Sequence, residues 1–214
     1  MSMLSVKLNL TERHCVVIGG GELAARRARL LRDAGARVTV IAPRVDSSLA
    51  DLDVQIERRP YREGDLRGAF LAVIATDDDA VNEAAAHEAR RANVMFSGMS
   101  GDVTFPATAH LGRITITVDT EGGAPSAARA IRDELVASID PDWQGIIEIA
   151  AVCRQAILAS AILSRAERRD RIRMLTDPEA IALFKSNGAQ AYRQHCELIV
   201  GTHTAEPLAK GTHD

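Results

Sequence analysis

The stretch His14-Cys15-Val16-Val17-Ile18-Gly19-Gly20-Gly21-Glu22-Leu23-Ala24 decides the fold. Its first five residues form a β-branched run that predicts a short buried strand. Three glycines follow, and the segment 22–34 then places apolar residues on one helical face until Gly35 ends it. The order of strand, glycine turn and helix is typical of the first unit of a parallel α/β sheet.

Segments of the same kind continue through the first 112 residues. Strands are predicted at 37–41, 54–56 and 69–74, and an alanine-rich helix at 79–91. Parallel strands joined by helices at these spacings require right-handed crossovers. The fold class predicted for residues 1–112 is therefore α/β, a doubly wound parallel sheet.

The pattern changes after residue 112. Residues 113–118 (RITITV) alternate like a strand with one solvent-exposed face, and Pro125 opens a predicted helix that runs to about Ser138. We expect a short separate region at 113–140, a helical domain at 141–201 and a disordered tail at 202–214. The helices expected after Asp140 span 142–160, 164–175, 178–186 and 188–200.

The composition excludes several classes of protein. The chain has 214 residues, of which 46% are hydrophobic and only 3% aromatic, and its net charge is −3. These values argue against a nucleic-acid partner. No apolar stretch approaches the roughly 20 residues of a membrane span, and the N-terminus lacks the pattern of a signal peptide.

The cysteines predict a cytoplasmic protein without a metal centre. Cys15, Cys153 and Cys196 are odd in number, far apart and not in a C-x-x-C pair, which argues against a disulfide framework and a thiolate zinc site. His203 and His213 in the C-terminal segment are weak evidence for a metal site.

Residues Gly19, Gly20, Gly21, Glu22, Leu23 and Ala24 fit the pattern G-x-G-x-x-A between a strand and a helix. The first glycine permits a tight turn, the second lets the backbone approach a pyrophosphate, and the small Ala24 lets the helix pack close to the sheet. The helix N-terminus offers free amides to the anion. The alternative is a glycine-rich turn without a ligand.

A carboxylate that usually binds the ribose is missing. It is expected about 20 residues after the glycines, but the second strand ends in Ile41-Ala42-Pro43-Arg44. Pro43 and Arg44 are candidate cofactor contacts. Arg44 could bind an adenosine phosphate or be solvated, so these residues leave NAD and NADP open.

Polar residues also follow the fourth predicted strand. Thr76, Asp77 and Asp78 lie where ligands bind in such sheets, and they are candidate contacts to a nicotinamide or its ribose. Alternatively, Asp77 or Asp78 caps the following helix.

Four segments together resemble the siroheme synthase N-terminal family. They are GGGELAARRARLLRDAGARVTVIAP (19–43), AVIATDDDAVN (72–82), FPA (105–107) and GGAPSAARAIRDEL (122–135). The resemblance is close over residues 4–140. It implies an NAD-binding Rossmann domain, a dimerisation region and a small helical domain. It further implies oxidation of precorrin-2, a tetrapyrrole, to sirohydrochlorin with NAD⁺ by a homodimer. Bifunctional members also insert Fe²⁺.

The chain departs from this family at the expected catalytic residue. The family's V-N-V-x-D-type segment carries its catalytic carboxylate, but that position is Phe96 here. Asp102, in the following loop, is the candidate substitute. Chelatase activity is expected to be reduced or lost.

A second departure concerns the substrate loop, where the serine before Pro125 in the family is an alanine here. The alternative for the acidic residues 119 and 121 is ordinary surface charge near a helix N-terminus. The candidate substrate contacts by resemblance are Asp119, Thr120, Gly122, Ala124 and Arg129.

Two other functions remain open from the sequence. A divergent paralogue could bind a tetrapyrrole or metal without dehydrogenase turnover, which Phe96 and Ala124 favour. An NAD-sensing regulatory dimer is the other, although such modules normally keep the carboxylate after the second strand.

Overall fold

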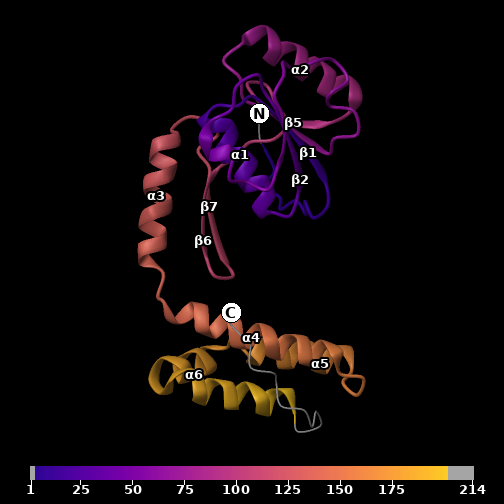
Figure 1. Ribbon diagram of the computed structural model, residues 1–214. Helices are drawn as coiled ribbons and strands as arrows, with labels where there is room; N and C mark the ends of the chain where they lie inside the picture. The colour runs from indigo at the N-terminus through magenta and orange to yellow at the C-terminus, as the bar shows by residue number, and fades with distance from the viewer. Residues whose placement is uncertain (1–2, 202–214) are drawn as a thin grey trace. The chain divides into compact units, whose positions relative to one another are not determined.

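The computed structural model describes residues 3–201, and the chain divides into two compact units, Met1–Phe105 and Pro106–Asp214 (Figure 1). The expected boundary after residue 112 lies seven residues beyond this division. The tail expected at 202–214 falls outside the described residues.

The first unit contains one parallel sheet with the strand order β3-β2-β1-β4-β5. This arrangement confirms the predicted doubly wound α/β class. Its elements are β1 (His14–Ile18), α1 (Glu22–Asp33), β2 (Arg37–Ile41), the 3-10 turn η1 (Ser47–Leu49), β3 (Gln55–Glu57), β4 (Leu71–Ile74), α2 (Asp79–Ala92) and β5 (Met95–Ser97).

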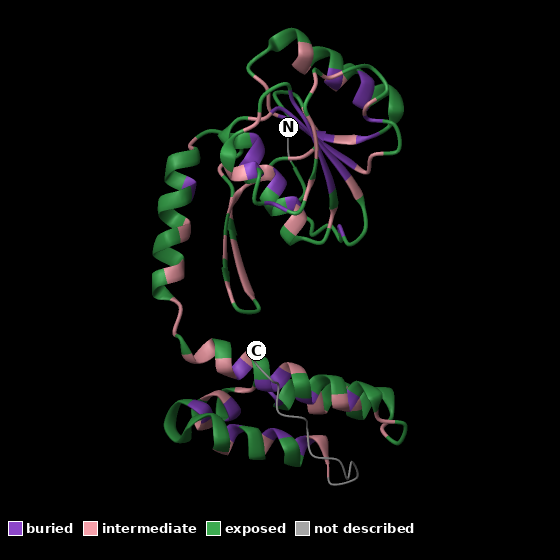
Figure 2. Ribbon diagram, in the orientation of Figure 1, coloured by how far each residue is buried: buried purple, intermediate pink, exposed green. Residues whose placement is uncertain are grey.

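Alternate residues of β1 point to opposite faces of the sheet and so build two cores. Cys15 and Val17 pack with the buried face of α1, whereas Val16 and Ile18 pack on the other side in the same cluster as buried residues of α2. The central strands β1, β2 and β4 are accordingly mostly buried in Figure 2, while both helices show exposed outer faces. Burial on both faces explains why residues 15–18 of β1 are all apolar.

The three central strands end level with one another. Ile18 pairs with Ile41 on β2 and with Ile74 on β4. The turns after these strands therefore open at one edge, which we call the carboxyl edge. The chain runs from β1 to β2 on one side and later returns to β4 on the other, so the switch point for ligand binding lies between β1 and β4.

The second unit begins with an antiparallel hairpin of β6 (Ala107–Leu111) and β7 (Ile114–Val118), against which α3 (Pro125–Ser138) packs. The residues of β7 are half-buried except Thr117, so its two faces differ less than the RITITV alternation predicts. β6 was not predicted.

Three helices follow: α4 (Asp142–Ala159), α5 (Arg165–Met174) and α6 (Pro178–Val200). They share a core of their own. The two helices expected at 178–186 and 188–200 correspond to the two parts of α6, which Gly188 separates with a non-helical φ of +79°. Among residues 3–201, no helix has both the length and the apolar character required to cross a bilayer.

Candidate functional site

The glycine turn after β1 packs tightly against its neighbours at the carboxyl edge. Gly19 has φ +120°, and a Cβ there would lie 2.1 Å from the carbonyl oxygen of Ala75 at the end of β4. A Cβ on Gly20 would lie 2.0 Å from the carbonyl oxygen of Arg44, beyond the end of β2. These contacts demand glycine at both positions, because no side chain fits between the backbones.

Gly21 faces open space instead. A Cβ there would meet no atom of the described chain within 4 Å beyond its chain neighbours. Gly21 is the N-cap of α1, no described side chain caps it, and the first helical bond runs from Ala25 N to Gly21 O at 2.9 Å. The amides of residues 22–24 precede that bond and can bind an anion. Fully buried Ala24 packs this end of the helix against the sheet.

The end of β2 contributes two exposed residues, Pro43 and Arg44. In the described part of the chain, the Arg44 guanidinium forms no ion pair. Asp46, which the sequence analysis did not single out, donates its amide to Gly20 O at 2.7 Å. Its carboxylate caps η1 by accepting from Ser48, and these hydrogen bonds hold the pKa of Asp46 below its usual value.

In the turn after β4, some polar side chains form hydrogen bonds within the protein and others are exposed to solvent. Asp78 caps α2 by accepting from Ala80 N at 2.9 Å and Val81 N at 3.2 Å, which confirms the alternative of a helix cap. Asp77 is exposed. Thr76 is half-buried and donates its hydroxyl to Asn82 Oδ1 at 2.7 Å.

The end of β5 carries no acidic side chain at residue 96. Phe96 is 1% exposed and packs in the core on the α2 side of the sheet, with the Arg90 guanidinium carbon 5.1 Å from the ring centre. The loop that follows is drawn back onto the strand by a bond from Val103 N to Phe96 O at 3.1 Å. Asp102 is exposed within this loop. The buried ring is therefore part of the core.

The candidate substrate residues lie in the second unit, in the turn before α3. Asp119 Oδ1 accepts from Glu121 N at 2.9 Å, and Thr120 Oγ1 accepts from Ala124 N at 3.2 Å. Gly122 has φ +78°, as such a turn requires. Asp119 and Thr120 thus stabilise the turn, and Arg129 is exposed on α3.

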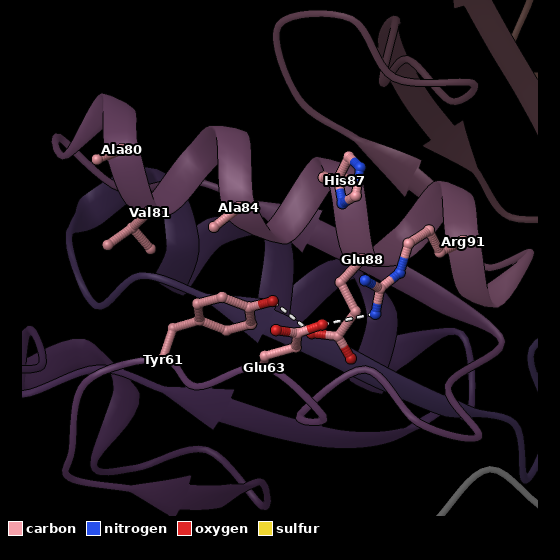
Figure 3. A pocket seen from close by; sticks show the side chains of 8 residues that line it. All are labelled: Tyr61, Glu63, Ala80, Val81, Ala84, His87, Glu88 and Arg91. Carbon is pink, nitrogen blue, oxygen red and sulfur yellow. Dashed lines mark hydrogen bonds and ion pairs between the residues drawn. The ribbon is translucent and has the colours of Figure 1, made fainter.

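A cavity of about 640 Å³ in the first unit has none of the candidate residues in its lining (Figure 3). Buried Glu88 on α2 accepts from the Tyr61 hydroxyl and, at 3.1 Å, from Leu66 N. Burial and the neighbouring Glu88 raise the pKa of Tyr61. Arg91 pairs with Glu63 at 2.5 Å. These contacts fasten the segment before β4 to α2, which is a structural role.

Comparisons with known proteins identify similar sequences and a similar fold. A family model described as "Putative NAD(P)-binding" matches residues 6–107. A protein named siroheme synthase from Methylococcus capsulatus (strain ATCC 33009 / NCIMB 11132 / Bath) is 32% identical over 220 residues, which covers 99% of this chain and 46% of that protein. The chain spans about half the length of such siroheme synthases.

Shorter relatives are also similar. A protein named precorrin-2 dehydrogenase from Priestia megaterium is 29% identical over 72% of this chain and 80% of its own length. The solved structure of "SirC, precorrin-2 dehydrogenase" covers 92% of this chain and 100% of that one with a TM-score of 0.75 at 24% identity, which shows the shared fold. The chain is a divergent member of the siroheme synthase N-terminal family.

Proposed function

We propose that this chain is an NAD-dependent dehydrogenase that oxidises precorrin-2 to sirohydrochlorin. The observation that carries the proposal is the uncapped N-terminus of α1 beside Gly21, at the switch point of the sheet. The names of the relatives supply the substrate class.

The carboxyl edge suits a dinucleotide. The amides of residues 22–24 would hold the pyrophosphate, because they form the positive end of the α1 dipole. Pro43 and Arg44 border the adenosine side, and Thr76 and Asp77 border the nicotinamide side. We assign NAD, since a relative named precorrin-2 dehydrogenase is 29% identical over 72% of this chain and the family resemblance implies NAD.

The reaction removes a hydride and a proton from the macrocycle, and the nicotinamide, when bound, accepts the hydride. The protein's part is to hold the substrate and to take the proton. Asp102 is the proposed base because its carboxylate is exposed in the loop after β5. The buried ring of Phe96 has no group that could accept the proton.

The substrate is a polyanion. Exposed Arg129, which forms no ion pair within residues 3–201, would pair with its carboxylate arms, and the turn of Asp119, Thr120, Gly122 and Ala124 would border it. The buried Phe96 supplies no iron ligand, so the proposal excludes efficient insertion of Fe²⁺.

An anaerobic assay with precorrin-2 and NAD⁺, followed by Fe²⁺, tests the proposal. We expect NADH and sirohydrochlorin in equal amounts, a lower rate with NADP⁺, and no iron insertion above the uncatalysed rate. Absence of both products would refute the dehydrogenase, and robust chelation would refute the lost iron insertion.

A second function, binding of a tetrapyrrole without turnover, is favoured by the burial of Phe96. In the same assay it would give tight binding of sirohydrochlorin without NADH formation. Binding of NADH alone would instead support an NAD-sensing regulatory dimer.

The proposal includes a homodimer formed through residues 113–140. Ile131 and Leu135 lie one turn apart on α3 and are each 44% exposed, while only Ala128 of this helix is buried. Large exposed apolar side chains in a stripe are typical of an interface. We expect a dimer by light scattering at micromolar concentration, and a monomer for Ile131→Glu combined with Leu135→Glu. A monomeric wild type would contradict the dimer.

The remaining domains and the location complete the proposal. Residues up to Phe105, seven fewer than the sequence indicates, form the NAD-binding domain, and 141–201 form the helical domain. The three cysteines are unpaired and buried, which supports a cytoplasmic location.

A further inference from the structure

Asn82 lies in the first turns of α2 but reaches back to the turn that precedes the helix. It is half-buried, and its backbone N–H donates to Asp78 O at 3.0 Å. Its side chain contacts Thr76, six residues earlier, at the carboxyl edge.

The two side-chain groups of Asn82 bind one residue reciprocally. Asn82 Oδ1 accepts from the Thr76 hydroxyl at 2.7 Å, and Asn82 Nδ2 donates to Thr76 O at 3.1 Å. The reverse orientation of the amide would set two oxygens against each other at the carbonyl, so the contacts themselves decide the orientation. This pair closes a ring that holds the turn.

The held turn forms one wall of the glycine loop. Because Gly19 has no Cβ, the backbone after β4 can lie close to it. A Cβ on Gly19 would lie 2.1 Å from Ala75 O and 3.2 Å from Thr76 N. Ala75 N also donates to Ile18 O at 2.8 Å. A shift of Thr76 would therefore displace the backbone on which Gly19 rests.

The same pair determines what the Thr76 hydroxyl offers to a ligand. Its single proton is committed to Asn82, at 2.7 Å rather than 3.1 Å to Asp78 O, and one lone pair accepts from Asp78 N at 3.2 Å. The remaining lone pair can only accept. A ligand at this point must donate, as a ribose hydroxyl or a carboxamide N–H does.

We infer that Asn82 is a positioning residue for the dinucleotide: through Thr76 it holds the β4–α2 turn against the glycine loop and fixes the Thr76 hydroxyl as an acceptor. This inference rests on the proposed dinucleotide site and names a residue that builds it.

Titration calorimetry of NAD⁺ into the full chain tests the inference with four variants. Asn82→Ala removes both bonds, and Asn82→Asp places an oxygen against Thr76 O. Thr76→Val removes the hydroxyl at nearly constant shape, and Thr76→Ser retains it. We expect the first three to raise the Kd of NAD⁺ by about tenfold, equal to about 1.4 kcal/mol, and Thr76→Ser to bind like the wild type.

Additivity and a stability control separate positioning from general damage. Asn82→Ala combined with Thr76→Val should weaken binding by less than the sum of the two single effects, because both variants break the bond between the Thr76 hydroxyl and Asn82. Asn93, at the other end of α2, has φ 55° and cannot reach the turn. Asn93→Ala should lower the melting temperature comparably and leave the Kd unchanged.

Each outcome decides between the inference and the function beneath it. Wild-type affinity in Asn82→Ala, or equal weakening in Asn93→Ala, would overturn the positioning role while the dinucleotide site stands. A wild type that binds neither NAD⁺ nor NADP⁺ would overturn both.

Discussion

The turn after β1 and the strand β5 lie at the same edge of one sheet but differ in the functional groups that they carry. The turn after β1 keeps every feature that an anion site requires, namely close-packed Gly19 and Gly20, open Gly21 and an uncapped helix. β5, at the same edge, carries Phe96 at the position where the family resemblance implies a carboxylate, and the ring fills the core.

The difference follows from what carries each role. The anion site is made of backbone amides, and its glycines are also required by packing, so substitution there would damage the fold. The acid is one side chain on a strand end, and a phenyl ring can replace it while improving burial. We therefore expect this protein to have retained cofactor binding more fully than catalysis as its sequence diverged.

Replacing Phe96 should have the largest effect. Phe96→Asp removes a ring that is 1% exposed and buries a charge. We expect unfolding free energy to fall by about 4 kcal/mol in urea denaturation, without faster turnover. Phe96→Leu is the matched control and should lose less than about 1.5 kcal/mol. A stable Phe96→Asp variant with a higher rate would show that the edge still accepts the acid.

Asp102→Asn tests whether the Asp102 carboxylate acts as the base in place of an acid at residue 96. We expect kcat to fall by about 10²-fold, at the lower end of general acid–base effects, with the Kd of NAD⁺ unchanged in calorimetry. Asp51→Asn, in an exposed turn between β2 and β3, is the control. Full activity in Asp102→Asn would clear this residue.

Gly21→Asp tests the other turn. The Cβ fits in open space, but the carboxylate would repel a pyrophosphate. We expect the Kd of NAD⁺ to rise on the order of 100-fold, about 2.7 kcal/mol, with little change in melting temperature. Gly21→Ala should bind more tightly than Gly21→Asp. Unchanged affinity in Gly21→Asp would remove the site from this loop.

Asp78→Ala should have the smallest effect. It removes the cap of α2 and should cost about 1 kcal/mol of stability, measured by urea denaturation. Since Thr76 and Asn82 remain, NAD⁺ affinity should change less than in Asn82→Ala. A larger loss of affinity would place the Asp78 carboxylate on the cofactor.

Strong periodic segments were predictable, and short ones were not. β1 and β2 occur at the predicted residues because β-branched runs between turn formers have few alternatives. β5 has only three residues, too few to show a period, whereas the alternation of β6 (ATAHL) is a period-two signal that the sequence analysis did not use. The close approach of Gly19 to Ala75 links residues 56 positions apart, which no local pattern reports.

The α/β class, the glycine loop and the absence of an acid at position 96 follow from the amino-acid sequence alone, because each depends on residue type and local spacing. The packing of the folded chain sets which side chains at the carboxyl edge can contact a ligand. The cap by Asp78 and the Thr76–Asn82 pair are local contacts, but their position beside Gly19 depends on the pairing of β4 with β1. Packing also buried Phe96, because burial is set by neighbours that are distant in the chain.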